Sequence, residues 1–169
     1  MFKDDYKTTV GASFLSKTIT FDNYLFSLSI WDTAGQEVYG SLIPMYCREA
    51  DMALVVFDLT KRNTFDKIKE WVDHVKSQSL NVIIIVCGNK LDLSDQREVS
   101  TKEAIEIANR LGVQYIETSA RNGCGIIDVF ETLVKEYIKQ NTEESRDITK
   151  ITQDVNISKK DRIEINKCC

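Results

Sequence analysis

The sequence has no run of apolar residues that approaches the roughly 18 needed to span a membrane as a helix. Its first residues, Met1-Phe-Lys-Asp-Asp-Tyr6, also lack the apolar core of a secretory signal peptide. We therefore expect a cytosolic protein. There is no basic stripe, and the net charge of −4 argues against contact with a phosphate backbone. Nucleic acid is not an expected partner.

The five cysteines lack the spacing of zinc ligands or of a disulfide framework. Three of them, Cys47, Cys87 and Cys124, stand singly, and we interpret these as buried or inert thiols. The other two, Cys168 and Cys169, are the last residues of the chain. The cysteines therefore predict neither a metal site nor a disulfide scaffold.

The pattern of apolar residues predicts a doubly wound α/β fold. A length of 169 residues with 43% apolar and 28% charged residues is typical of one globular domain. Continuous apolar runs at 52–57 and 82–87, with a shorter one at 113–116, predict strands buried on both faces of a parallel sheet. Alternating residues at 24–30 predict a half-buried strand that forms a hairpin with residues 9–20.

Three helical patterns separate these strands. Apolar residues recur at helical spacing over 65–75, after Asn63 or Thr64 as a cap, and again over 130–137. Between them, Ser100-Thr-Lys-Glu103 fits a capping box and Gly112 a helix stop. The alternation predicts three layers with a mostly parallel sheet. Apolar residues thin out beyond residue 140, so we expect a disordered tail over residues 141–169.

Polar residues follow two of the predicted strands. Asn89, Lys90 and Asp92 come after the run 82–87, at the strand end where open α/β sheets bind ligands. A carboxylate at Asp92 can accept both N–H donors of guanine, whereas adenine offers no matching pair, and an unpaired buried carboxylate is costly. Lys90 can lay its stem along the base. Ser119 and Ala120, after the next strand, can bring backbone N–H groups to the guanine carbonyl. The alternative for the first loop is a solvated turn.

The segment Trp31-Asp-Thr-Ala-Gly-Gln-Glu37 also follows a predicted strand. Asp32 can hold a water on Mg²⁺, Gly35 can offer its N–H to a γ-phosphate, and Gln36 can orient the attacking water. A strand that ends in a glycine turn is the alternative, but it explains only Gly35. No segment reads Gly-x-x-x-x-Gly-Lys-Ser/Thr, the loop that cradles phosphates in such sites.

These motifs, in this order, resemble the Rab family of Ras-like small GTPases, most of all its endosomal branch, from Phe2 to about Gln140. The resemblance implies the P-loop GTPase fold and a GTP-binding switch that hydrolyses GTP with Mg²⁺ and regulates vesicle or endosomal traffic. It also implies that Thr9 ligates Mg²⁺ and that Phe2 packs near the guanine. From chemistry alone Phe14, Trp31 and Tyr46 are best interpreted as core aromatics, but the resemblance reverses this, because they match the aromatic triad through which Rab proteins meet effectors.

The two terminal cysteines, Cys168 and Cys169, resemble the double-cysteine end that Rab proteins carry for geranylgeranylation. Two lipids would anchor a protein stably where one is marginal; an incidental Cys-Cys end is the alternative. The implied partners are effectors, an exchange factor, a GTPase-activating protein, a prenylation escort and a GDP-dissociation inhibitor. The implied protein is a monomer that cycles between the cytosol and the cytosolic face of endosomal or other endomembranes.

In this family the phosphate loop follows a first strand that lies between the strand ending at Asp32 and the strand ending at Asp58. The sequence has no residues for that strand, the loop or the helix after it, so we expect an incomplete GTPase domain over residues 1–140. Two strand edges would stay unpaired, or the gap would close and displace the guanine loops. Met1 directly before Phe2 indicates a missing upstream exon or a truncation. These absences argue against activity of the chain as written. The alternatives are a pseudo-GTPase that binds partners without nucleotide and an incomplete gene product.

Overall fold

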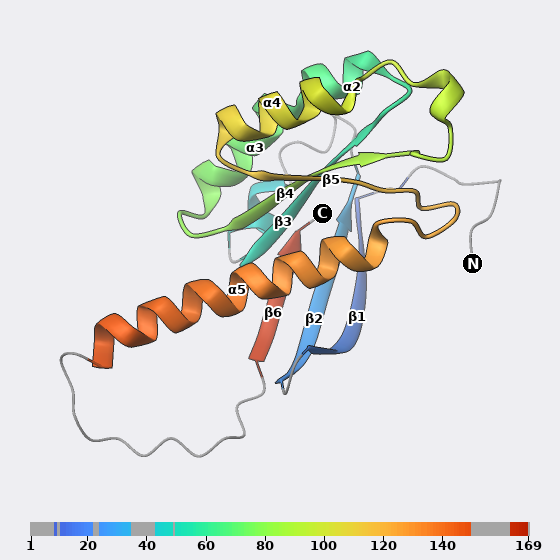
Figure 1. The fold of residues 1–169 in the computed structure, drawn as a ribbon. Coiled ribbons are helices and arrows are strands. Elements are labelled where there is room, and N and C mark those ends of the chain that lie inside the picture. Colours follow the sequence, from blue (N-terminus) through green and yellow to red (C-terminus); the bar gives the residue numbers. More distant parts are fainter. Residues whose placement is uncertain are drawn as a thin grey trace.

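The computed structural model describes residue 9 and residues 11–21, 24–34, 43–48, 50–149 and 163–168. Their sheet has six strands in the order β1-β2-β6-β3-β4-β5. Helices cover both faces: α3 and α4 lie on one side and α5 runs along the other (Figure 1). The predicted three-layer, doubly wound α/β architecture is confirmed.

The elements follow the predicted order with small shifts in their bounds. The strands are β1 (Ala12–Phe21), β2 (Tyr24–Thr33), β3 (Met52–Asp58), β4 (Ile83–Asn89), β5 (Gln114–Glu117) and β6 (Ile163–Cys168). The helices are α1 (Ile43–Cys47), α2 (Arg62–Asp66), α3 (Ile68–Gln78), α4 (Thr101–Leu111) and α5 (Ile126–Thr149), with a short 3₁₀ turn at Ser94–Gln96. The sequence patterns predicted neither α1 nor the 3₁₀ turn.

The N-terminal hairpin is antiparallel, and β3, β4 and β5 are parallel to one another. The hairpin register runs from Ala12 opposite Thr33 to Phe21 opposite Tyr24, and the predicted turn at residues 22–23 lies outside the described residues. Continuous apolar strands suit β3 and β4 because each carries buried residues on both faces. The parallel part of the sheet thus forms the interior of the molecule.

Two apolar clusters make the core, one on each face of the sheet. The first joins β3 and β4 to α2, α3 and α4, with Phe57, Val72 and Val86 among its members. The second joins β2, β3 and β4 to α5, with Phe26 and Leu133 fully buried. Cys47 and Cys87 are buried in these clusters, as predicted, whereas Cys124 is exposed. The clusters fix the ends of β4 and β5, which carry the predicted guanine loops.

The helix predicted after Asn63 or Thr64 is two helices, α2 and α3, and neither residue caps it. Lys61 is the N-cap of α2 and makes no side-chain cap. The Thr64 hydroxyl instead donates to the Lys61 carbonyl at 2.7 Å and accepts from the Asp58 N–H at 3.0 Å. The prediction was wrong because Thr64 bonds back to the end of β3, which places it inside the first turn of α2.

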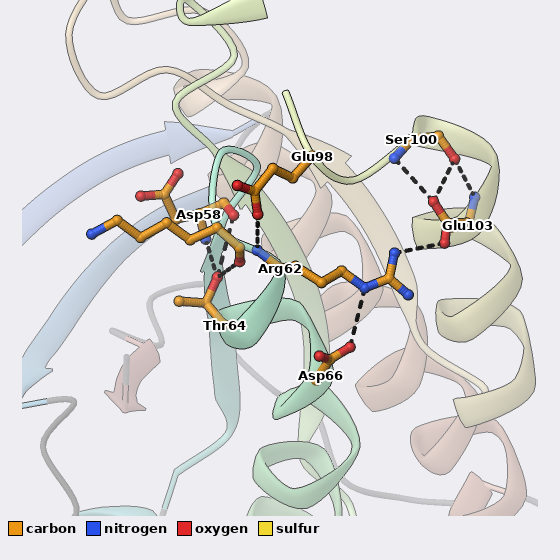
Figure 2. Close-up of polar contacts among 8 residues, drawn as sticks. Asp58, Arg62, Thr64, Asp66, Glu98, Ser100 and Glu103 are labelled. Atoms are coloured by element: carbon orange, nitrogen blue, oxygen red, sulfur yellow. Dashed lines mark hydrogen bonds and ion pairs between the residues drawn. The ribbon is translucent and has the colours of Figure 1, made fainter. Parts of the chain in front are cut away.

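The predicted capping box at the start of α4 is confirmed. The Ser100 hydroxyl accepts from the Glu103 N–H, and the Glu103 carboxylate accepts from the Ser100 N–H, both at 3.3 Å. The Glu103 carboxylate also accepts a hydrogen bond from the Arg62 guanidinium at 2.8 Å. The backbone N–H of Arg62 donates to the Glu98 carboxylate, so these contacts connect the capping box and the segment before it to the start of α2 (Figure 2). At the other end of α4, Gly112 takes the left-handed conformation, with φ of 65°.

The Ser100→Ala variant is expected to lower the free energy of unfolding by about 1 kcal/mol, because the first turn of α4 loses its hydroxyl acceptor. That loss corresponds to a fall of about 3 °C in Tm. Thermal and urea unfolding monitored by circular dichroism measure both quantities. Lys102→Ala, an exposed change in the same turn, is the matched control and should stay within about 0.5 kcal/mol of the parent. If both variants lose the same free energy of unfolding, the loss of the Ser100 cap is not the cause.

Two elements of the structure lie within the region after residue 140, for which a disordered tail was predicted. Helix α5 continues to Thr149, and residues 163–168 form β6, which lies between β2 and β3 (Figure 1). Two strands that face a gap present unpaired N–H and C=O groups, and a third strand satisfies them whatever its side chains are. Among the described residues, β6 pairs with residues 26–31 of β2 but with only Met52 and Ala53 of β3, so the expected unpaired edge is absent from β2 over that range and from the start of β3.

Candidate functional site

The two predicted guanine loops meet at the carboxyl ends of β4 and β5. The Asn89 side-chain oxygen accepts a hydrogen bond from the Ala120 N–H at 3.1 Å. Backbone bonds join the same loops: the Thr118 N–H donates to Gly88 O at 2.8 Å, and the Leu91 N–H donates to Thr118 O at 3.0 Å. Asn89 thus fixes the second loop, and in this structure the Ala120 N–H is directed to Asn89.

Asp92 is held by residues of the second loop. The Ser119 hydroxyl donates to Asp92 Oδ1 at 2.5 Å, and Ser119 is fully buried. Arg121 Nη1 lies 3.9 Å from Asp92 Oδ2, and the Asp92 side chain is 15% exposed. A carboxylate with one oxygen fixed in this way has a defined orientation, so it can present acceptors to a planar ligand with little loss of rotamer freedom.

Lys90 points to the end of β3. Its Nζ lies 2.7 Å from Asp58 Oδ2, and its backbone has a φ of 68°. Burial disfavours the Asp58 carboxylate, but hydrogen bonds from Lys90 and Thr60 outweigh burial, and the pKa of Asp58 falls below its ordinary value. The ion pair joins the ends of β3 and β4, and sequence analysis did not anticipate it.

A second ion pair lies behind the loop that carries Ser119. Arg97 contacts both Glu117 oxygens, at 2.9 and 2.7 Å. Thr101 and Tyr115 donate hydroxyl groups to the same carboxylate at 2.8 and 2.9 Å. These bonds, with Arg97 first, lower the pKa of Glu117, although burial opposes them. Sequence reasoning missed this network because no pattern joins charges 20 residues apart.

Gly125 allows the second loop to turn back onto its strand. Its φ is 69°, and a Cβ at this position would overlap the carbonyl oxygen of Glu117. Only glycine combines that conformation with so close an approach of two backbones. The Ser119 N–H then donates to Cys124 O at 2.9 Å, which closes the loop. The shape of the loop therefore depends on Gly125 as well as on Asn89.

The predicted magnesium residues lie next to each other. The Thr9 hydroxyl donates to Asp32 Oδ2 at 3.4 Å, although the residues are far apart in sequence. Asp32 also lines a cavity of about 400 Å³ whose wall includes Thr64, Lys67 and the middle of β3. Within the described residues, no cluster of three or more His, Cys, Asp or Glu side chains could hold a metal. Mg²⁺ needs no such cluster, because it keeps waters and binds one or two protein oxygens plus phosphates.

Several predicted site residues lie outside the described part of the chain: Phe2, Gly35, Gln36 and Cys169. Cys168 is described through its backbone only, as the last residue of β6. Their roles in binding, catalysis and lipidation stay predictions. No helix in the described ranges has both the length and the apolar character needed to cross a bilayer.

The three aromatic residues of the predicted effector triad form one cluster of mutually tilted rings. The Phe14 and Trp31 ring centroids are 4.8 Å apart, and those of Trp31 and Tyr46 are 5.4 Å apart. Phe14 is 52% exposed, which is unusual for a core aromatic. The cluster therefore presents an apolar face that β1, β2 and α1 hold in place.

Comparison with known proteins agrees with these features. The Ras family model matches residues 1–139. The chain is similar to the proteins named Ras-related protein Rab-31 of Rattus norvegicus, Mus musculus and Homo sapiens. Each is 42% identical to it over 136 residues, a match that covers 80% of this chain and 70% of the relative.

Proposed function

Because this chain belongs to the Ras family, as a Rab-like GTPase of membrane traffic, we propose that its loops at 89–92 and 118–120 bind the guanine base of GTP and GDP. The observation that carries the proposal is the bond from Ser119 to Asp92, which fixes a carboxylate at the end of β4. That carboxylate can accept both guanine donors at once. Asn89 supports the proposal by joining the two loops.

Competition among nucleotides tests the guanine site. A fluorescent GDP analogue is bound to the natural protein, and unlabelled GDP, GTP, ADP or ATP is then added. We expect both guanine nucleotides to displace the probe and adenine nucleotides to fail at concentrations about 100-fold higher, because adenine leaves Asp92 unpaired. Equal displacement by ATP would contradict the assignment of Asp92. Failure of every nucleotide would instead support a module that binds partners without nucleotide.

We further propose that Thr9 and Asp32 hold Mg²⁺, Thr9 directly and Asp32 through a bound water. Their contact at 3.4 Å supports this role, and hydroxyl and carboxylate oxygens are ligands of the kind that Mg²⁺ takes. The ion supplies charge stabilisation to the phosphates. In the same proposal the Gly35 N–H binds the γ-phosphate and Gln36 orients the attacking water. Phe2 packs near the base.

The Gln36→Leu variant is expected to slow GTP hydrolysis about tenfold and to leave nucleotide affinity unchanged. The loss of one orienting hydrogen bond raises the barrier by about 1.4 kcal/mol. Single-turnover phosphate release measures the rate, and the fluorescent analogue measures affinity. Gln78→Leu, at the far end of α3, is the matched control. Unchanged turnover in Gln36→Leu would remove this residue from the mechanism.

The triad of exposed Phe14 and partly buried Trp31 and Tyr46 is the surface proposed for effectors. The terminal cysteines are the proposed sites of geranylgeranylation, which would bring the protein to the cytosolic face of endosomal membranes and give it a role in endocytosis. An exchange factor, a GTPase-activating protein, a prenylation escort and a GDP-dissociation inhibitor are the corresponding regulatory partners. The similarity to Rab-31 proteins supports this set.

A further inference from the structure

We propose that Asp58 is a positioning residue of the guanine site: it holds the Lys90 ammonium, so that the lysine stem lies across the site before the base arrives. The proposal rests on the guanine site proposed above, and it adds a residue of β3 to the loops that follow β4 and β5. In this proposal Asp58 acts through Lys90 and does not touch the base. Its effect is on how long the nucleotide stays bound.

The Asp58 carboxylate is fixed through both of its oxygens. Oδ1 accepts from the Thr60 N–H at 2.9 Å and from the Thr60 hydroxyl at 2.7 Å. Oδ2 lies 2.7 Å from Lys90 Nζ. The backbone is held as well, because the Asp58 N–H donates to the Thr64 hydroxyl at 3.0 Å (Figure 2). The Asp58 side chain is only 13% exposed, and such burial favours a carboxylate that is paired with a cation.

Lys90 begins its loop in a conformation that few residues with a side chain adopt. Its φ of 68° is the only positive value among the non-glycine residues that the structure describes. Such conformations persist where the surrounding structure holds them, and they concentrate at functional sites. Here the ends of β3 and β4 lie side by side, since Asn89 pairs with Asp58 and the Leu59 N–H donates to Asn89 O at 2.9 Å. The Lys90 side chain can therefore reach from one strand end to the other.

The ion pair gives the Lys90 stem a defined path. The lysine backbone directly follows β4 and the ammonium lies at the end of β3, so the aliphatic stem spans the carboxyl edge between the two strands. The side chain is still 45% exposed, so a planar base can pack on the stem while the ammonium stays bonded. An unpaired lysine samples many rotamers, and a ligand that orders it pays in entropy. Pairing with Asp58 orders the stem in advance, which is preorganisation of the site.

The loop at 89–92 is thus held from both of its neighbouring strands. Asp92 accepts a hydrogen bond from Ser119, which follows β5, and Lys90 pairs with Asp58, which ends β3. The first contact orients the group that accepts the guanine donors. The second orients the stem on which the base lies. Loss of the second contact should therefore weaken nucleotide binding without changing which base is preferred.

Dissociation of GDP from the natural protein tests the role of Asp58. A GDP analogue with a fluorescent group on the ribose is displaced by excess unlabelled GDP, and the rates in the parent and Asp58→Asn are compared. The amide still offers an oxygen to Thr60, but its bond to Lys90 is no longer one between two charges. We expect dissociation to become about tenfold faster, which corresponds to ~1.4 kcal/mol. Asp73→Asn breaks the exposed pair with Lys69 on α3 and is the matched control, which should release GDP as the parent does.

Two readouts separate positioning from a merely structural role. In the first, Asp58→Asn is added to Lys90→Met, which keeps a long stem without the charge, and we expect no further change in the dissociation rate. In the second, GDP is compared with IDP, whose base lacks the 2-amino group that Asp92 is proposed to bind. Asp58→Asn should weaken both nucleotides equally and leave the ratio of their affinities unchanged. An effect that persists in Lys90→Met, or a smaller ratio, would overturn the proposal, because Asp58 would then shape the loop as a whole.

Thr60→Val carries the same test if urea unfolding shows that Asp58→Asn does not fold. It removes the hydroxyl bond to Asp58 Oδ1 and retains the ion pair. We expect GDP release about threefold faster than in the parent, and no acceleration when Thr60→Val is added to Lys90→Met. Unchanged release from Asp58→Asn, or from Thr60→Val where Asp58→Asn is unfolded, would overturn the positioning role and leave the guanine site in place. A parent that does not bind the GDP analogue would contradict the guanine site itself, and the role of Asp58 would fail with it.

Discussion

The Asp92→Asn variant is expected to bind GDP about 100-fold more weakly than the parent and to prefer XDP, the xanthine nucleotide. The carboxylate accepts from both guanine donors, whereas an amide presents one acceptor and one donor group. Its NH₂ then faces the 2-amino group of guanine, and the loss of about 3 kcal/mol is that of an unpaired buried donor. Xanthine carries a carbonyl at that position, which accepts from the same NH₂. The change should therefore exchange specificity and not abolish binding.

Fluorescent GDP and XDP analogues measure both affinities in the natural protein. Asp95→Asn is the matched control, because it makes the same chemical change at an exposed residue of the adjacent 3₁₀ turn. It should bind GDP as the parent does. Asp92 also accepts a hydrogen bond from the Ser119 hydroxyl, so a second effect of replacing Asp92 is distortion of the loop. A distorted loop would lower both affinities together, and that result would contradict direct base recognition by Asp92.

The periodicity of the sequence was sufficient to predict most of the fold. The continuous apolar runs at β3 and β4 and the helical spacing in α5 each leave one secondary structure as the best way to bury apolar area. The capping box at Ser100 was also predictable, because a cap depends on residues within one turn. Local patterns therefore gave the layers and the order of the elements.

The position of β6 was not predictable from its own residues. Only residues 163–166 alternate between apolar and polar, a short signal in a largely polar region, and the pairing of β6 depends on the gap that β2 and β3 leave. The division of α2 from α3 was missed for a related reason, since Thr64 bonds to the end of β3. Elements that exist because of a distant partner carry no signature in a window of sequence.

The candidate site shows the same limit. The sequence predicted two loops that meet, because Asn89, Asp92 and Ser119 are of suitable residue types and follow successive strands. The ion pairs that hold those loops could not be predicted. Lys90 pairs with Asp58 and Arg97 pairs with Glu117, and each pair joins residues too far apart in sequence for a motif to include both. Motifs identify the groups that face a ligand, whereas the ion pairs behind them follow only from the tertiary structure.

The Glu117→Gln variant is expected to lose about 2–3 kcal/mol of unfolding free energy at neutral pH. Arg97 and Glu117 side chains are only 23% and 16% exposed, so the charge left on Arg97 is poorly hydrated once its partner is neutral. The loss corresponds to a fall of about 6–9 °C in Tm. Urea unfolding measures it. Glu106→Gln, the same change at an exposed position of α4, should stay within about 0.5 kcal/mol.

The pH dependence of that difference identifies the ion pair as its cause. Because the folded-state pKa of Glu117 lies below its ordinary value of 4.5, the contribution of the carboxylate is complete above about that pH. It declines as the pH falls from about 4.5 through the folded-state pKa, because in that window the unfolded chain binds more protons at Glu117 than the folded chain does. The parent and Glu117→Gln should therefore converge in stability under acid conditions, whereas Arg97→Ala should be destabilised at neutral pH like Glu117→Gln. A difference that stays constant with pH would indicate lost packing at the base of the Ser119 loop, and the network would then act through shape and not through charge.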